Sequence, residues 1–241
     1  MAKVKQTKKN NILEIVLIAL LFVLVTAGVI VGIIQTAKPP QSEGELTGQT
    51  DGKDENANEE TAENDGLYQP KALDENKTYY ADMEIEQYGK ITVRLDQKSA
   101  PITAANFVEL AEKGFYDGLT FHRIIEGFMM QGGDPNGNGT GGADYNIKGE
   151  FSANGVQNPL SHTRGALSMA RATPFDSASC QFFIVHKDYP SLDGDYAVFG
   201  YVTEGMDVVD AICTEATPTD SNGTIPAAEQ PVIKTLTVRV E

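Results

Sequence analysis

The sequence contains no tryptophan and only two cysteines, Cys180 and Cys213, which lie 33 residues apart. Without a CxxC pair, a cysteine-held zinc site and a disulfide-dense scaffold are both excluded. Positive charge is also scarce, because 19 Lys and Arg stand against 34 Asp and Glu, a net charge of −15. Nucleic acid is therefore excluded as the main partner, since binding phosphates needs clustered cations.

The three histidines are isolated from one another, and no HxxxH or HExxH spacing indicates a bound metal. Ser168 stands in Leu-Ser-Met, outside the GxSxG context of a hydrolase. The glycine-rich segment 132–142 begins like a calcium loop, but Tyr145 stands where the bidentate Glu is needed. We therefore expect no metal and no cofactor, and interpret this segment as a surface turn. Cys180 and Cys213 could pair outside the cytoplasm, although buried free thiols are favoured.

A long apolar run near the N-terminus is typical of a membrane anchor. Ile15–Ile34 is twenty residues without a charge, which as a helix would span about 30 Å, the hydrocarbon thickness of a bilayer. The alternative is a cleaved signal peptide, whose apolar core is usually shorter, about 7–15 residues. We predict a basic cytoplasmic tail over 1–11 and a transmembrane anchor in contact with lipid over 12–34. The lysines before the run place the N-terminus inside the cell.

An acidic segment follows the anchor. Residues 35–66 contain one large aliphatic side chain, Leu46, no aromatic ring, and nine acids against two lysines. Such a composition buries too little apolar surface to offset the entropy of ordering. We predict a disordered linker over 35–77 that holds a folded domain, residues 78–241, away from the membrane.

The domain sequence predicts mostly strands. Period-two alternation over Ala81–Glu86 and Ile91–Leu95 indicates a hairpin, and Pro101 near the start of an amphipathic run that Gly114 ends indicates a helix. Further strands are expected near residues 121–125, 128–131, 166–170, 182–185, 197–201 and 232–240, with a second helix over 205–213. Many short strands with glycine-rich turns predict a closed antiparallel barrel capped by two helices.

One segment, FHRIIEGFMMQGGD at 121–134, places a cation in an apolar strand. Taken singly, its apolar residues would be ordinary core and Arg123 a surface cation. Together with GNGTGG (137–142), LSMA (167–170), QFFI (181–184) and LDGDYAVFG (192–200), however, it closely resembles the cyclophilin-type peptidyl-prolyl isomerases. The resemblance covers 78–241 and implies an eight-stranded barrel with a groove for proline-containing polypeptides on its outer face.

The resemblance also implies the roles of individual residues. Arg123 would be the catalytic cation that hydrogen-bonds the twisted amide. The other residues carried over are substrate-binding: His122, Phe128, Met129, Gln131, Ala170, Arg171, Gln181, Phe183, Leu192 and Tyr196. Of these, Phe128, Met129, Phe183 and Leu192 would line the proline pocket with His122 alongside, and Gln131 would bond the substrate carbonyl and help hold the guanidinium. Ala170 and Arg171 would offer backbone groups to the peptide, and Gln181 would line the neighbouring pocket.

Three positions depart from the common pattern. Ser191 replaces a tryptophan tied to cyclosporin binding, so weak binding of that drug is expected, while Tyr196 replaces a histidine and Arg171 an asparagine. The expected function is isomerisation of X-Pro bonds, by a monomeric catalytic domain, in proteins folding outside the cytoplasm, at the surface of a Gram-positive bacterium. The alternative is a non-catalytic module that binds proline-containing segments as a chaperone or scaffold.

Overall fold

The computed structural model of the protein describes residues 66–241. The predicted tail and anchor, and the linker up to residue 65, lie outside this part of the chain. Within residues 66–241, no helix has the length and apolar character needed to cross a membrane.

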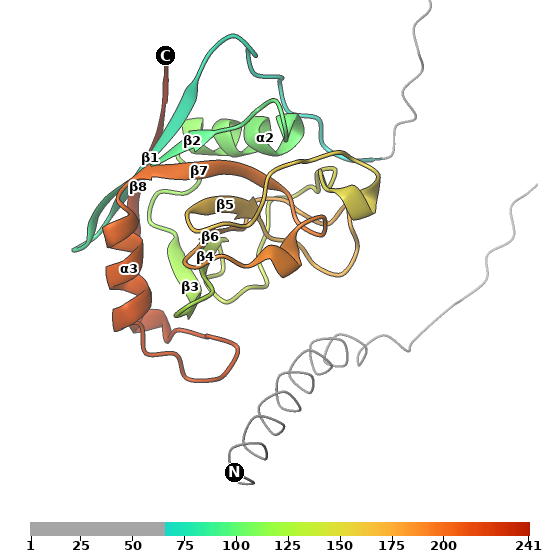
Figure 1. Ribbon diagram of the computed structural model, residues 1–241. Helices are drawn as coiled ribbons and strands as arrows, with labels where there is room; N and C mark the ends of the chain where they lie inside the picture. Colours follow the sequence, from blue (N-terminus) through green and yellow to red (C-terminus); the bar gives the residue numbers. More distant parts are fainter. Residues whose placement is uncertain (1–65) are drawn as a thin grey trace, which may run out of the picture. The chain divides into compact units, whose positions relative to one another are not determined.

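The described chain forms one eight-stranded antiparallel sheet, in the order β3-β4-β6-β5-β7-β2-β1-β8 (Figure 1). The strands are β1 (Tyr79–Ile85), β2 (Gly89–Leu95), β3 (Thr120–Ile125), β4 (Met129–Asp134), β5 (Ala166–Met169), β6 (Phe182–Val185), β7 (Val198–Glu204) and β8 (Ile233–Val240). The two helices are α2 (Pro101–Glu112), which packs against β7 and β8, and α3 (Met206–Glu215), which packs against β2 and β4. The predicted hairpin, strands and helices are confirmed.

The sheet is a curled half-barrel, so the prediction of a closed barrel is wrong. Its two end strands, β3 and β8, are linked only at the isolated bridge between Thr120 and Val232 among the described residues. Pro231, next to this bridge, accepts a hydrogen bond from Phe121 N at 2.9 Å but has no N–H to return one. Beyond it, β3 pairs with a loop instead, through Ile124 N to Gly223 O (2.8 Å) and Ile225 N to His122 O (3.0 Å).

Alternation along the strands divides the apolar side chains between two faces of the sheet. On β6, Phe182 and Ile184 belong to the main core, whereas Phe183 and Val185 belong to a second cluster. The main core lies between the inner face and the two helices, and is dominated by aromatic rings such as Phe107, which contacts Phe182 edge-on at 5.5 Å. The second cluster lies on the opposite face of the same strands.

A distant carboxylate caps helix α2. Ala100, at its N-cap, makes no capping side-chain bond, but the buried carboxylate of Glu150 accepts the N–H groups of Ile102 (3.0 Å) and Thr103 (2.7 Å). This satisfies two of the free N–H groups at the helix start. The cap also fixes the loop that carries Glu150 against the helix.

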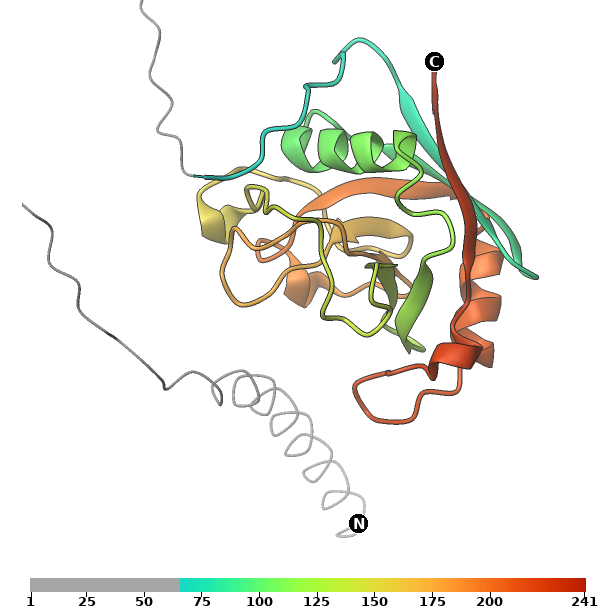
Figure 2. The ribbon, with the colours of Figure 1, turned by 180° about the vertical axis from the view of Figure 1, so that it is seen from behind.

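The segment 66–77, assigned above to the linker, packs on the domain. Tyr68 and Leu73 contact the main core, and Gln97 donates to Lys77 O at 2.7 Å. In Figures 1 and 2 this segment, drawn in cyan, runs beside α2. Packing of the domain therefore begins before Thr78.

Candidate active site

The second apolar cluster lies on the outer face of the sheet, where the resemblance implies the proline pocket, and we refer to it as the apolar hollow. Its buried members are Met129, Ala166, Phe183, Val185 and Val198, and partly buried around them are Ile125, Phe128, Leu160, Ala170, Leu192, Tyr196 and Tyr201. Six of the substrate-binding residues expected from the sequence are in this cluster: Phe128, Met129, Ala170, Phe183, Leu192 and Tyr196. An outer sheet face usually carries polar side chains, so this cluster indicates a binding surface.

Strand register aligns the polar residues with the hollow. Arg123 on β3 pairs with Gln131 on β4, and Gln131 pairs with Phe183 on β6. Directly paired residues point to the same face of a sheet. The pairing therefore places the guanidinium, the amide and the aromatic ring in one row across three strands.

Three contacts orient the Arg123 guanidinium. Its Nε donates to Asn222 O at 2.7 Å, and its Nη1 donates to Gln131 Oε1 at 3.3 Å and lies 3.8 Å from Met129 Sδ. Its Cζ lies 5.8 Å from the centroid of the Phe128 ring. Burial lowers the pKa of Arg123 from its usual value, against the opposing effects of Tyr196 and Asp220, but an arginine remains protonated at neutral pH. The result is a fixed cation at the edge of an apolar hollow.

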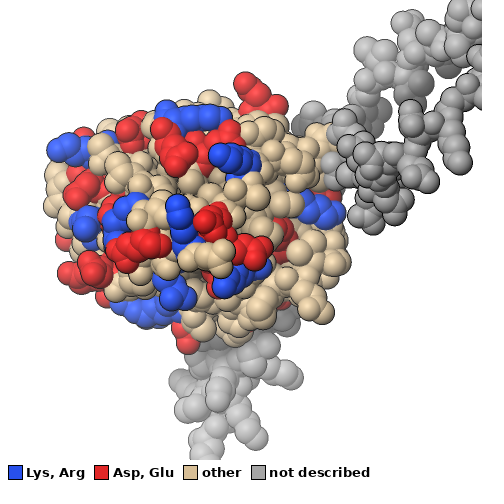
Figure 3. All heavy atoms as spheres, turned by 90° about the horizontal axis from the view of Figure 1, so that it is seen from above, with Lys and Arg blue, Asp and Glu red and all other residues tan. Residues whose placement is uncertain are grey.

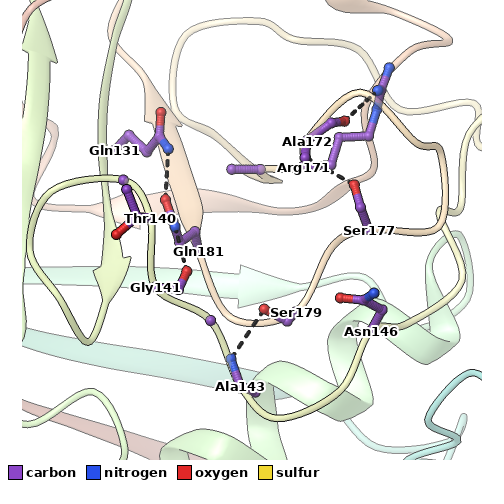
Figure 4. Close-up of a pocket in the computed structure, with 13 residues that line it drawn as sticks. Gln131, Thr140, Gly141, Ala143, Asn146, Arg171, Ala172, Ser177, Ser179 and Gln181 are labelled. Atoms are coloured by element: carbon purple, nitrogen blue, oxygen red, sulfur yellow. Dashed lines mark hydrogen bonds between the residues drawn. The ribbon is translucent and has the colours of Figure 1, made fainter. Parts of the chain in front are cut away.

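A relay of amides fixes the orientation of Gln131. Gln131 Nε2 donates to Gln181 Oε1 at 2.9 Å, and Gln181 Nε2 donates to Gly141 O at 2.8 Å. The amide oxygen of Gln131 must therefore face Arg123. Figure 4 shows these two glutamines at one side of a second hollow.

That second hollow is a polar pocket of about 420 Å³. It is lined by Gln131, Gly139, Thr140, Gly141, Gly142, Ala143, Asn146, Ala170, Arg171, Ala172, Ser177, Ser179 and Gln181. Gln131 borders both this pocket and the guanidinium, so one extended peptide can reach both hollows. Gln181 lines the neighbouring pocket, as the resemblance implied.

The side chain of Arg171 is occupied by neighbours. Its Cζ lies 4.7 Å from the Tyr196 ring centroid, 5.0 Å from that of Phe151 and 5.1 Å from that of Phe175. Its Nε donates to Asp195 O at 3.0 Å. Arg171 thus contributes its backbone and its bulk to the pocket rather than a free charge. Ala170 N already donates to Gln181 O at 2.9 Å, so the group that Ala170 can offer a peptide is its carbonyl.

His122 lies at a β-bulge, between Phe121, which pairs with Gly132, and Arg123. Bulges re-aim side chains and are common next to active sites. The imidazole is 4% exposed, and neither ring nitrogen has a hydrogen-bond partner among the described residues. Burial lowers its pKa, which outweighs the opposing effect of Asp134. The bulge places His122 under the Gly139 turn and Arg123 on the groove side.

Spacing alone did not reveal a hydrogen-bonded relay that runs from the buried Ser168 and His162 to the exposed Asp193. His162 Nδ1 lies 2.8 Å from Asp193 Oδ1, and its Nε2 lies 3.0 Å from Ser168 Oγ. This resembles a hydrolytic triad in its partners, but Ser168 and the His162 imidazole have no exposed surface and cannot meet a substrate. His162 instead stacks on Phe183, with ring centroids 5.9 Å apart and planes 13° apart. The relay supports the floor of the hollow.

The sequence analysis also missed two parts of the rim. Tyr189 is 40% exposed and lies against Phe128, with centroids 4.3 Å apart. The loop 219–225 supplies Asn222 O to Arg123, and Asp220 stabilises this loop by accepting the N–H of Asn222 at 3.0 Å. An Asp-x-Asn-Gly turn is visible in the sequence, but its contact with residue 123 is not.

Only residues 135–142 of the Gly-rich segment form the predicted surface turn, because residues 132–134 are buried at the end of β4. Asp134 is buried, and its carboxylate accepts backbone N–H groups of Asn136 (2.8 Å), Asn138 (3.0 Å) and Gly139. These bonds lower the pKa of Asp134, although burial opposes them. Both cysteines are buried free thiols.

Comparison with known proteins agrees with this geometry. Residues 80–238 match the family model described as cyclophilin type peptidyl-prolyl cis-trans isomerase/CLD. Peptidyl-prolyl cis-trans isomerase B of Bacillus subtilis is 52% identical over 123 residues, 51% of this chain and 82% of that protein. A peptidyl-prolyl cis-trans isomerase of Helicobacter pylori strain J99 is 47% identical over 138 residues, 56% of this chain and 82% of that protein.

A solved structure has the same fold. It is a cyclophilin type peptidyl-prolyl cis-trans isomerase of Cryptosporidium parvum, crystallised in the presence of the dipeptide Ala-Pro. It matches with a TM-score of 0.59 and 28% identity, over 66% of this chain and 98% of that one.

Proposed function

This chain belongs to the cyclophilin-type peptidyl-prolyl cis-trans isomerases, and we propose how its residues carry out that reaction and where in the cell they do so. The observation that carries the proposal is a fixed guanidinium, that of Arg123, beside an apolar cluster on the outer face of the sheet.

A catalyst of this reaction needs mainly to stabilise the twisted amide electrostatically. Rotation about a peptide bond meets a barrier of about 18–20 kcal/mol, because the C–N bond has partial double-bond character. At 90° of twist the prolyl nitrogen has lost conjugation and gained a lone pair. A preorganised donor aimed at that nitrogen stabilises the twisted state more than either planar isomer, which lowers the barrier.

Arg123 is the donor in this mechanism. Its Nε and Nη1 are used by Asn222, Gln131 and Met129, whereas no described residue accepts from Nη2. The two Nη2–H groups therefore remain for the amide of the substrate. The contacts at Nε and Nη1 fix the plane of the guanidinium in advance, so little reorganisation is needed during rotation.

The apolar hollow and the polar pocket divide the substrate between them. Phe128, Met129, Phe183 and Leu192 surround the proline ring, where water is displaced and the cation acts more strongly. The polar pocket receives the peptide segment next to the proline, with Ala170 O available to its backbone. The substrates are accordingly proline-containing polypeptides.

The domain acts outside the cytoplasm in this proposal. The uncharged run within residues 12–34 and the lysines before it support a retained anchor with the N-terminus inside. The acidic residues after it support a linker that keeps a monomeric domain away from the bilayer. The clients are then proteins that fold after export from a Gram-positive bacterium.

Exchange of a short X-Pro peptide by the full chain tests the mechanism. We expect Arg123→Ala to lower kcat/KM by about 10²–10³, the usual cost of removing one preorganised donor. Arg123→Lys should recover little, because an ammonium cannot use the fixed planar contacts. The matched control is Arg94→Ala, which removes an exposed arginine of β2.

An unchanged rate in folded Arg123→Ala protein would refute the role of Arg123 without affecting the family assignment. Tight peptide binding without exchange in the wild type would support the alternative, a non-catalytic binding module. Thermal unfolding of each variant checks that the fold is intact.

A further inference from the structure

The segment 66–77 lies before the part of the chain that the family model matches, residues 80–238. Nevertheless it contacts Asn146, one of the residues that line the polar pocket. We propose that Tyr68 is a positioning residue for the pocket wall formed by Ala143, Asn146 and Ser179, so that the end of the linker helps to determine which peptides bind. This inference rests on the proposed function, in which the pocket receives the segment next to proline.

Tyr68 makes three contacts with two different segments. Its backbone N–H donates to Asn146 O at 2.8 Å. Its ring lies on that of Tyr145, with centroids 4.1 Å apart. Its hydroxyl donates to Glu109 Oε1 of α2 at 2.6 Å. Tyr68 thereby holds the loop 143–146 against a rigid helix.

From Tyr145 the contacts continue to the pocket. Tyr145 Oη donates to Asn106 Oδ1 at 2.8 Å, and Asn106 Nδ2 donates to Ser179 O at 2.6 Å. Ser179 Oγ accepts the N–H of Ala143 at 3.2 Å, a bond drawn in Figure 4. Asn106 is fully buried. The wall therefore forms a hydrogen-bonded layer whose outer support is Tyr68.

The pocket wall needs support from Tyr68 because the segment just before Ala143 is rich in glycine. Four of the six residues from Gly137 to Gly142 are glycine, and glycine leaves the backbone free to adopt many conformations. After this loop, the first strand-like pairing among the described residues is the isolated bridge between Ile147 and Ala178. Asn146 and Ala143 lie on the pocket side of that bridge, so contacts outside the sheet must position them.

The test compares two kinds of peptide substrate with the full chain. One peptide has only alanines around an Ala-Pro bond, and the others carry Ser, Gln or Lys at the positions before the proline. Tyr68→Ala should raise KM for the polar peptides roughly three- to tenfold, the effect of losing an aromatic pair and a hydrogen bond. It should leave kcat unchanged for every peptide, and KM unchanged for the alanine peptide. Tyr68→Phe keeps the stacking and should fall between Tyr68→Ala and the wild type.

Leu73→Ala is the matched control, because Leu73 lies in the same segment and also contacts the main core, but makes no hydrogen bond or ring contact with the loop 143–146 among the described residues. Its expected profile is that of the wild type for both substrates. Equal losses on both peptides in Tyr68→Ala, or no loss on either, would overturn the inference.

A second readout does not depend on turnover. The ¹⁵N amide resonances of Ala143, Asn146 and Ser179 should shift in Tyr68→Ala and stay in place in Leu73→Ala. Unmoved resonances would overturn the positioning role. If the wild type were inactive but the resonances still shifted in Tyr68→Ala, the result would count against the proposed isomerase mechanism and not against the positioning role of Tyr68. Failure of the mechanism and failure of the positioning role are therefore distinguishable.

Discussion

Ser191 stands at the position where the resemblance to cyclophilins implies a tryptophan. Ser191 is exposed, and the neighbouring aromatic ring, Tyr189, lies against Phe128 rather than over the hollow. A serine cannot supply the large flat contact of an indole. The resemblance ties cyclosporin binding to that tryptophan, so we expect the drug to bind this chain weakly.

Ser191→Trp should tighten cyclosporin binding by about tenfold or more, since tryptophans are frequent binding hot spots. The chain has no other tryptophan, so the fluorescence of this residue reports the binding directly. Ser221→Trp, on the exposed loop next to Asn222, is the control for a surface indole. Equal affinity of the wild type and Ser191→Trp would show that another feature limits the drug.

Two buried histidines predict a loss of stability in mild acid. Burial lowers the pKa of both His122 and His162, and the attraction of Asp193 only partly offsets this for His162. In the unfolded chain these side chains titrate near pH 6.5, so the unfolded state takes up protons before the folded state does. The free energy of unfolding must therefore fall as pH drops below about 6.5.

Denaturant unfolding between pH 7.5 and 5.5 measures this slope. Asp134 and Asp193 have lowered pKa values, so their contribution is lost only in stronger acid. Burial raises the pKa of Glu150, an effect of opposite sign. His122→Gln and His162→Gln should each flatten the dependence, and a pH-independent wild type would contradict the prediction.

At the residue scale, the sequence predicted which residues lie at the site better than it predicted which residues they contact. Phe183 and Met129 were found because the motifs around them are distinctive. The relay from Ser168 through His162 to Asp193 was not predicted. His162 is six positions from Ser168 and thirty-one from Asp193, and only the fold brings the three together. The orientation of the Gln131 amide likewise depends on Gln181, fifty positions away.

At the scale of elements, the loop 219–225 pairs with β3 along the edge that β8 does not cover. Gly223 has φ +86°, and a Cβ there would lie 2.7 Å from Ile124 O and collide with Ile125. Asn222, next to it, accepts the Nε–H of Arg123. The loop can therefore approach β3 closely enough to orient the guanidinium only because residue 223 is glycine.

Gly223→Ala should lower both stability and activity. Left-handed backbone strain costs about 1–3 kcal/mol, and displacement of Asn222 should lower kcat about tenfold or more, because small misplacements in an active site are costly. Gly155→Ala is the control, since Gly155 has φ +77° but open space around a Cβ. It should lose stability only. Full activity in Gly223→Ala would show that the loop does not orient Arg123.

Regular elements were predictable because alternating burial follows directly from strand geometry. The open seam between β3 and β8 was not predicted, although its cause, Pro231, stands in the sequence. A proline limits pairing only if a strand would otherwise pair there, which requires the topology to be known. The same holds for the cap of α2, because Glu150 lies 47 residues beyond the N–H of Thr103.

At the scale of the whole molecule, composition predicted a folded domain but set its start too late. Residues 66–77 read as linker because their only aliphatic or aromatic side chains larger than alanine are Leu67, Tyr68 and Leu73. Tyr68 and Leu73 nonetheless find partners on a surface already formed by later elements. A window of local composition cannot detect such long-range contacts.

Charged side chains of both signs share one face of the domain. On the face drawn in Figure 3, Lys and Arg atoms are interspersed with Asp and Glu atoms. This face therefore shows no patch of one sign, although the whole chain has a net charge of −15. In the proposed arrangement, specificity comes from the groove and from location.

The proposed membrane orientation of the anchor can be tested in intact cells. With the N-terminus inside, protease added to intact cells that express the full chain should remove the domain and leave the lysine-rich tail protected. Replacing Lys3, Lys5, Lys8 and Lys9 by Glu should reverse or randomise the orientation, because basic residues are retained in the cytoplasm. The control replaces Lys98, Lys113, Lys187 and Lys234 of the domain by Glu, which makes the same change in net charge far from the apolar run. A domain that is released into the medium would indicate a cleaved signal peptide, and a domain that stays protected in intact cells would refute the extracytoplasmic location. Neither result would alter the chemistry at Arg123, because the residues that orient it all lie in the folded domain.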